Sequence, residues 1–344
     1  MQELKKSNRA LVLWGGAMLA DITYSYLIKN NIKVDAVAVS KKYHVPNHRI
    51  GSNDVVVLED YVMENPGCNV LVAFSGYEEE SIVNYRKYIH NVYCCELAGA
   101  IIYGWFIDEY YLSTHKTDLD WLRNELADAE SKKALDDFIY QKSTCIYEKV
   151  YTGDMFFDEK IIQLNRDEIF FDCGAFTGDT IEDFITHLKK RGIKQYKKIY
   201  AIEPDDTNFQ KAKENLKNYK NIQLLKKGVW DATGTLTFSQ NASLISSISS
   251  DGEDAIEVDT IDSIVGNEKV TYIKMDIEGA ELNALRGAEN TIRTNKPNLG
   301  ICIYHKPEDL YKIPRYIKSI VPEYKLYLRN HLPTATDSVL YAVI

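Results

Sequence analysis

The sequence lacks long apolar runs, long basic runs and cysteines at metal-binding spacing. No apolar segment approaches the ~20 residues that a membrane-spanning helix needs, and the short apolar stretch 11–14 leads into glycines instead of a signal-peptide pattern. We therefore expect a cytoplasmic protein with no membrane span. The 41 lysines and arginines are outnumbered by 50 aspartates and glutamates, giving a formal net charge of −9. Because phosphate contacts need clustered basic side chains, nucleic acid is not the expected partner.

The six cysteines form neither a metal-ligand pattern nor a disulfide framework, so we assign them no catalytic role and predict no metal site from spacing. The chain has 344 residues, of which 45% are hydrophobic and 26% charged. These values are typical of a globular protein large enough for two domains. They do not indicate an oligomeric state.

Short apolar strands alternate with helices over residues 1–100, which predicts a small Rossmann-like domain with a parallel sheet. Gly15 and Gly16 follow its first strand, but the full dinucleotide-binding glycine pattern is missing. Ser40 and Lys41 stand where an NAD site has a ribose-binding acid. An unliganded or degenerate domain is the preferred interpretation, and a phosphate site at the basic strand end is the alternative.

Residues 101–165 show helical periodicity with polar faces and are interpreted as a helical connector. Alternation then resumes over residues 166–344 and ends with two consecutive strands, 324–329 and 338–343, without a helix between them. This order predicts an α/β fold of the class I methyltransferase type. We expect a doubly wound sheet of about seven strands with an antiparallel strand inserted at the end.

A glycine turn at residues 169–180 is the first candidate ligand site. An apolar strand ends at Asp172, a turn follows with Gly174 and Gly178, and a helix is predicted from Asp179. Glycines allow the backbone to approach a ligand closely, and the helix start offers unpaired N–H groups to a carboxylate. Many nucleotide-binding folds share this pattern, so it is not specific by itself.

Three acidic residues end successive strands of the same sheet: Asp172, Glu203 and Asp276. The carboxyl ends of central strands line the ligand crevice of a doubly wound sheet. Acidic neighbours suit a cationic sulfonium nucleoside with ribose hydroxyls and repel a pyrophosphate, which favours S-adenosylmethionine over NAD. The alternative is that each acid only stabilises the start of the next helix.

These motifs resemble the FkbM family of S-adenosylmethionine-dependent methyltransferases over roughly residues 150–344. The similar segments are Phe171–Thr180, Glu203–Asp205, Lys274–Glu281 with Leu285–Ala288, Ile303–Pro307 and Tyr324–Asn330. The resemblance implies methyl transfer, usually to a hydroxyl of a sugar, glycan unit or natural product, as in polysaccharide biosynthesis. The first domain lies outside the resemblance.

Carried over by position, one group of residues is implied to bind the cofactor: Asp172, Gly174, Ala175, Gly178, Glu203, Val229, Trp230 and Asp276. For Trp230, a place in the core is the alternative to flanking the adenine. Methylating a hydroxyl requires removal of its proton. His305, at the end of the fifth strand, is the preferred general base, and Asp276 is the competing one. The two could instead bind a divalent metal, although no close ligand spacing supports this.

Other polar residues have open roles. Glu278 and Glu281 either belong to the site or stabilise the next helix, and Lys306, Arg329 and His331 either recognise a charged acceptor or form a solvated rim. The acceptor pocket is expected in the variable parts, including the serine-rich interval 243–250.

Two further functions stay open at this point. One is a nucleotide-sugar-binding or NAD(P)-dependent enzyme that uses the first domain, and the other is a non-catalytic protein that binds S-adenosylmethionine. The sequence does not identify the acceptor.

Overall fold

A computed structural model describes residues 2–74, 82–93, 107–144, 153–238, 254–331 and 337–344. Its contacts divide the chain into two units. The first comprises residues 1–117, 132–151 and 330–337, and the second comprises residues 118–131, 152–329 and 338–344. Within the described ranges, no helix is long and apolar enough to cross a membrane.

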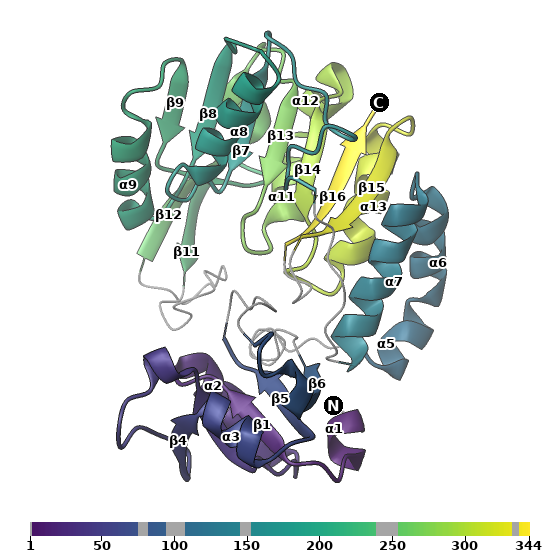
Figure 1. The fold of residues 1–344 in the computed structure, drawn as a ribbon. Helices are drawn as coiled ribbons and strands as arrows, with labels where there is room; N and C mark the ends of the chain where they lie inside the picture. The colour runs from purple at the N-terminus through teal and green to yellow at the C-terminus, as the bar shows by residue number, and fades with distance from the viewer. Residues whose placement is uncertain (1, 75–81, 94–106, 145–152, 239–253, 332–336) are drawn as a thin grey trace. The chain divides into compact units, whose positions relative to one another are not determined.

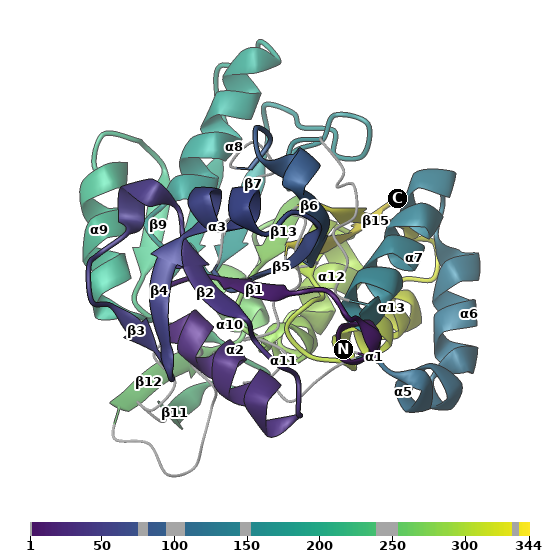
Figure 2. The same ribbon diagram turned by 60° about the horizontal axis from the view of Figure 1, so that its bottom comes forward.

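The first unit contains a mostly parallel sheet whose six described strands run in the order β3-β4-β2-β1-β5-β6 (Figure 2). Among the described strands of this sheet, only β3 and β4 pair in antiparallel fashion. The strands are β1 (Leu11–Trp14), β2 (Ala36–Val39), β3 (Arg49–Ile50), β4 (Asn53–Val57), β5 (Cys68–Val72) and β6 (Ile89–Tyr93).

Helices cover both faces of this sheet. Leu13 of β1 shares a core with Leu27 of α2 (Met18–Lys29), whereas its neighbour Trp14 shares a second core with Leu58 of α3 (Leu58–Glu64). Successive side chains of a strand point to opposite faces, so α2 and α3 lie on opposite sides. The unit is therefore Rossmann-like, as the strand–helix alternation indicates.

Several elements of this part differ from the expectation. The helix expected at residues 79–88 lies partly outside the described residues, and its described end forms a 3-10 helix, η3 (Arg86–Tyr88). Helix α3 was not expected, because its seven residues are too few for a clear helical period. The other described elements before residue 150 are α1 (Gln2–Lys6), η1 (Lys41–Tyr43), α5 (Glu109–Thr114), α6 (Lys116–Glu125) and α7 (Ala129–Thr144).

The second unit is built on a sheet whose seven described strands run in the order β15-β16-β14-β13-β7-β8-β9 (Figure 1). Neighbouring strands from β14 to β9 run parallel. Strand β16 lies between β14 and β15, and it pairs with β14 in antiparallel fashion. This confirms the predicted doubly wound sheet with an inserted antiparallel strand. The strands are β7 (Ile169–Cys173), β8 (Lys198–Ile202), β9 (Ile222–Leu225), β13 (Tyr272–Met275), β14 (Asn298–Cys302), β15 (Lys325–Asn330) and β16 (Ser338–Val343).

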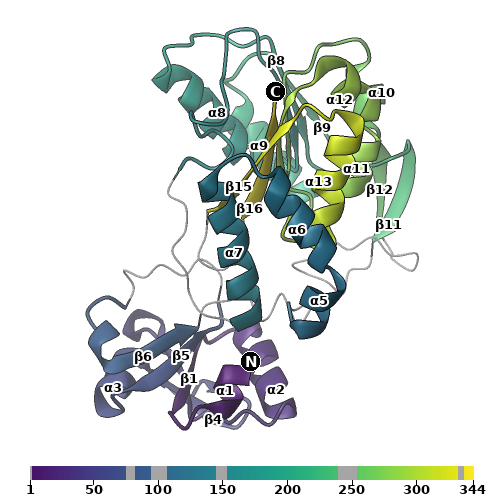
Figure 3. The same cartoon turned by 90° about the vertical axis from the view of Figure 1, so that its right-hand side faces the viewer.

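Helices flank this sheet, with α8 (Asp179–Lys190) on one face and α11 (Glu281–Arg286), α12 (Glu289–Asn295) and α13 (Asp309–Ile320) on the other (Figure 3). Phe184 of α8 stacks on Phe170 of β7 with ring centroids 4.7 Å apart, which fixes the helix that follows the glycine turn. The second unit also contains the helices α9 (Asp206–Leu216) and α10 (Ile261–Val265).

The single helix expected at residues 280–293 is interrupted at Gly287 between α11 and α12. A Cβ at Gly287 would lie 2.0 Å from the carbonyl oxygen of Trp230. The carbonyl of Gly287 also accepts a hydrogen bond from the backbone N–H of Asp262. The close approach explains the glycine, whereas Asp262 marks the break: its N–H occupies the Gly287 carbonyl and its carboxylate accepts the N–H groups of Asn290 and Thr291 at the start of α12.

A small second sheet follows β9. In its described residues, β10 (Gly228–Val229), β12 (Asp254–Asp259) and β11 (Gly234–Phe238) lie in that order. They correspond to the β-rich interval expected before residue 258. The serine-rich segment 243–250, expected near the acceptor, lies outside the described residues.

Candidate active site

The glycine turn joins β7 to α8, and each glycine adopts a backbone conformation that favours glycine. The φ angles of Gly174 and Gly178 are +79° and +89°. The N–H groups of Gly174 and Ala175 both donate to the carbonyl of Ile202, at 3.0 and 2.9 Å, which ties the turn to the end of β8. The turn is thus held in place by the neighbouring strand.

The close approach at Gly174 is to the protein's own backbone. A Cβ at Gly174 would lie 2.0 Å from the carbonyl oxygen of Asp276, and one at Gly178 would lie 2.9 Å from Leu216. Contacts within the protein therefore explain both glycines without the close approach of a ligand that the sequence suggested. Gly174 brings the ends of β7 and β13 together, and Asp276 reaches the turn for that reason.

The side chain of Asp172 is enclosed by the protein, where it supports the glycine turn and does not face an open pocket. Its side chain is fully buried, and its Oδ1 lies 3.0 Å from Lys274 Nζ on the neighbouring strand. Lys274 also donates to the carbonyl of Gly174 at 2.8 Å. Burial raises the pKa of Asp172 to about 6, although Lys274 opposes the shift. The pair fixes the turn, because separating two buried charges costs several kcal/mol.

Glu203 lies at the end of β8 and is 6% exposed. Its Oε2 accepts the N–H of Phe176 and its Oε1 accepts that of Asp205, both at 2.9 Å. Burial raises the pKa of Glu203 to about 7 against these two hydrogen bonds. Each carboxylate oxygen has two lone pairs, so Glu203 keeps acceptor capacity for hydroxyl groups.

Val229 and Trp230 follow β9, as expected; Val229 belongs to β10 of the small second sheet, and Trp230 comes directly after that strand. Val229 is buried, Trp230 is half-buried, and the N–H of Trp230 donates to the carbonyl of Asp259 at 3.0 Å. The hydrogen bond thus holds the backbone of Trp230 in place, while part of the residue stays accessible to solvent.

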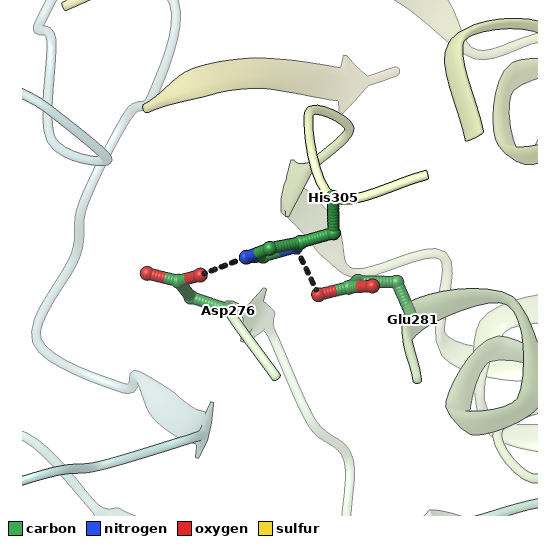
Figure 4. A group of neighbouring side chains, drawn as sticks. All are labelled: Asp276, Glu281 and His305. Carbon is green, nitrogen blue, oxygen red and sulfur yellow. Dashed lines mark ion pairs between the residues drawn. The ribbon is translucent and has the colours of Figure 1, made fainter. Parts of the chain in front are cut away.

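Asp276, His305 and Glu281 come together where β13 and β14 end (Figure 4). His305 Nδ1 lies 3.0 Å from Glu281 Oε1, and His305 Nε2 lies 3.5 Å from Asp276 Oδ1. Glu278 Oε2 is 3.6 Å from the same Nε2. The imidazole is 3% exposed and Glu281 is completely buried, whereas Asp276 is 28% exposed and Glu278 is exposed.

The charges around His305 control its protonation. Burial alone would lower the pKa of His305, but Glu281, Asp276 and Glu278 together raise it to about 10. One potential ligand atom from each of Asp276, Glu281 and His305 lies within 4.8 Å of the others. However, the two nearest carboxylates approach different ring nitrogens (Figure 4). This arrangement suits shared protons better than one ion, since an imidazole gives one nitrogen to one metal.

Two residues of this region were missed from the sequence. Lys274 interrupts an apolar strand, which was a signal for a buried ion pair. The hydroxyl of Tyr304 donates to Asp276 Oδ1 at 3.3 Å. The position of Tyr304 next to His305 in the sequence does not predict this contact.

Arg329, suggested as an acceptor-binding or rim residue, is 2% exposed and pairs with Asp128 at 2.7 Å. Its guanidinium also approaches Glu130 and donates to Ser131. The rim interpretation of Arg329 is therefore wrong, because the guanidinium is buried against Asp128 and the first turn of α7.

The paired glycines of the first unit also pack against protein. A Cβ at Gly15 would lie 2.6 Å from the carbonyl oxygen of Ala73, and one at Gly16 would lie 2.7 Å from Val39. The N–H of Lys41 donates to the carboxylate of Glu59. Packing explains these residues without a bound dinucleotide.

Comparison with known proteins gives a family match and a fold match. Residues 172–329 match the family model described as the methyltransferase FkbM domain. The crystal structure of a methyltransferase FkbM from Methylobacillus flagellatus KT superposes with a TM-score of 0.72 at 22% identity, covering 99% of this chain and 92% of that chain. At this identity the likeness shows the fold, which is that of class I methyltransferases.

Two further structures cover only about half of this chain. A putative methyltransferase from Streptococcus mutans in complex with SAH gives a TM-score of 0.33 at 16% identity, covering 54% of this chain and 92% of that one. Fibrillarin from Aeropyrum pernix with natively bound S-adenosyl-L-methionine gives 0.32 at 15% identity, covering 53% and 70%. Comparison with curated proteins gives no match.

Proposed function

We propose that this chain, an S-adenosylmethionine-dependent methyltransferase with a methyltransferase FkbM domain at residues 172–329, methylates a hydroxyl of a sugar, glycan unit or natural-product-like metabolite. The observation that carries the proposal is the Asp276–His305–Glu281 array beside the glycine turn. An alcohol is a poor nucleophile until its proton leaves, so an oxygen acceptor needs a positioned proton acceptor.

The residues at the strand ends fit the cofactor. Glu203 has free lone pairs for the ribose hydroxyls, and the part-exposed Asp276 places negative charge where a cationic sulfonium and ammonium are favoured. Trp230 and Val229 are proposed to flank the adenine. Asp172, Gly174, Ala175 and Gly178 are proposed to act through the shape of the turn. When bound, S-adenosylmethionine supplies the electrophilic methyl group.

His305 is proposed to take the hydroxyl proton on Nε2, while buried Glu281 keeps Nδ1 protonated and the ring oriented. In the free protein the pKa of about 10 keeps His305 protonated at neutral pH. Positive charge beside Asp276 would offset the carboxylates and lower this pKa, so cofactor binding would prepare the base. Asp276 is the alternative proton acceptor, and Asp276→Asn tests it.

The proposed function is tested by incubating the full chain with methyl-labelled S-adenosylmethionine and panels of hydroxylated sugars, nucleotide sugars, glycans and natural products. We expect label on an ether oxygen of one of these acceptors. Label confined to nitrogen, sulfur or carbon would contradict O-methylation. Calorimetry with S-adenosylhomocysteine, NAD and NADP should give heat for the first only, and a clear heat for NADP would instead favour chemistry in the first unit.

Protonation of Glu203 should weaken cofactor binding. Because the pKa of Glu203 is about 7, the carboxylate that accepts the ribose hydroxyls is mostly ionised at pH 8 and mostly protonated at pH 6. If only the ionised form binds, linkage predicts that the Kd for S-adenosylhomocysteine rises about tenfold from pH 8 to pH 6. Calorimetry at several pH values measures this. Glu203→Gln should bind more weakly at pH 8 and lose the pH dependence, and an unchanged slope in this variant would assign the titration to another group.

A further inference from the structure

Phe176 combines two unfavourable features in the turn between β7 and α8. It is a non-glycine residue with φ of +46°, a conformation that bulky side chains rarely adopt. Its ring is also 53% exposed, which places it among the exposed large hydrophobic residues of the described chain. A strained backbone under an exposed aromatic ring is typical of a binding position, because packing within the protein does not explain why a large apolar ring stays exposed there.

The backbone of Phe176 is held firmly. Its N–H donates to Glu203 Oε2 at 2.9 Å, and the residue before it, Ala175, donates to the carbonyl of Ile202. The N–H of Gly178 donates back to the carbonyl of Ala175 at 2.7 Å. The left-handed backbone of Phe176 thus forms one contact with the proposed ribose-binding carboxylate and leaves the ring at the surface of the turn.

The strand order indicates which part of a cofactor the ring would meet. Neighbouring strand ends run β13, β7, β8 and β9, and they carry Asp276, the turn with Phe176, Glu203 and the approach to Trp230. If Glu203 holds the ribose and Trp230 the adenine, Phe176 lies on the other side of the ribose, between Glu203 and Asp276. That is the side of the sulfonium and the amino acid.

We propose that the ring of Phe176 binds the sulfonium cation of S-adenosylmethionine through its π face and thereby distinguishes the charged cofactor from neutral S-adenosylhomocysteine. This rests on the proposed cofactor site. An aromatic face attracts a ligand cation within about 6 Å of the ring centroid, and the attraction grows as water is excluded. Carboxylates such as Asp276 attract the cation from a distance. The attraction of the ring ends once the methyl group is transferred, because the sulfur then carries no positive charge. The contact therefore favours substrate over product.

The test compares the Kd values of S-adenosylmethionine and S-adenosylhomocysteine by calorimetry on the full chain without acceptor. Phe176→Leu keeps an apolar side chain and removes the π face. We expect it to weaken S-adenosylmethionine binding about 3–30-fold and to change S-adenosylhomocysteine binding less than about twofold. Phe176→Trp should keep the preference for the charged cofactor.

A second variant separates binding from folding. Phe176→Asn suits the left-handed backbone, so it should raise the melting temperature of the free protein and still lose the preference for S-adenosylmethionine. Equal weakening of both ligands by Phe176→Leu, or no change in either, would overturn the proposal. Failure of the cofactor site itself gives a different result, because Glu203→Gln would then leave the binding of both ligands unchanged.

Discussion

Replacing His305 with alanine or glutamine should lower turnover by about 10²–10⁴-fold, the range associated with loss of a general base. The reason is that His305 Nε2 faces Asp276 at the edge of the proposed acceptor site, and its other nitrogen is fixed by buried Glu281. The Kd for S-adenosylhomocysteine should change only slightly, because this ligand does not require proton removal. Single-turnover rates with the identified acceptor, measured beside calorimetry, separate the two effects.

The pH profile of turnover tests the same assignment independently. Carboxylates raise the pKa of His305 to about 10 in the free protein, so kcat/KM, which reports the protonation of the free protein, should rise with pH as the imidazole loses its proton. Glu281 is the largest raising influence, and Glu281→Gln removes its charge. The pKa of His305 then falls, and the rising limb should move to lower pH while the maximum rate decreases through poorer orientation of the ring.

Three results would contradict the role of His305. Turnover that survives both His305→Ala and His305→Gln would show that the base lies elsewhere, and Asp276→Asn would then be the decisive variant. A rising limb that stays at the same pH in Glu281→Gln would assign the titration to another group. If added Mn²⁺ or Mg²⁺ is required for activity and a chelator abolishes it, the array holds a metal instead of a proton.

The sheet of the second unit could be predicted because its signals are local and repeated. Each strand is a short apolar run, each crossover helix has a clear period, and the missing helix between β15 and β16 indicated the inserted antiparallel strand. The break at Gly287 could not be predicted, because the groups that meet its backbone, the Trp230 carbonyl and Asp262, are distant in the sequence. Close backbone approaches leave no periodic signal.

The candidate site was predictable as a set of positions but not as a set of interactions. Strand ends placed Asp172, Glu203 and Asp276 at one edge of the sheet, yet only the structure separates a fully buried Asp172 from a part-exposed Asp276. Glu281 was interpreted as either a site residue or a helix-stabilising charge. Its 3.0 Å approach to His305 depends on how α11 packs beside β14, which sequence spacing does not specify.

Gly174→Ala should destabilise the protein strongly, because two separate costs coincide. Alanine at φ of +79° costs about 1–2 kcal/mol, and its Cβ would lie 2.0 Å from the carbonyl oxygen of Asp276. Relief of such an overlap by backbone movement adds about 1–3 kcal/mol. We expect the free energy of unfolding to fall by roughly 2–5 kcal/mol, measured by urea denaturation.

Gly192→Ala is the matched control. Gly192 has a similar φ of +73°, but a Cβ there would meet no heavy atom of the described residues within 4 Å. This variant should therefore lose only about 1–2 kcal/mol and keep its affinity for S-adenosylhomocysteine. In Gly174→Ala, by contrast, the turn and Asp276 must separate, and affinity should fall at least about tenfold, or by 1.4 kcal/mol. Equal losses of stability in the two variants would show that φ alone constrains Gly174, and that its contact with the end of β13 does not hold the turn in place.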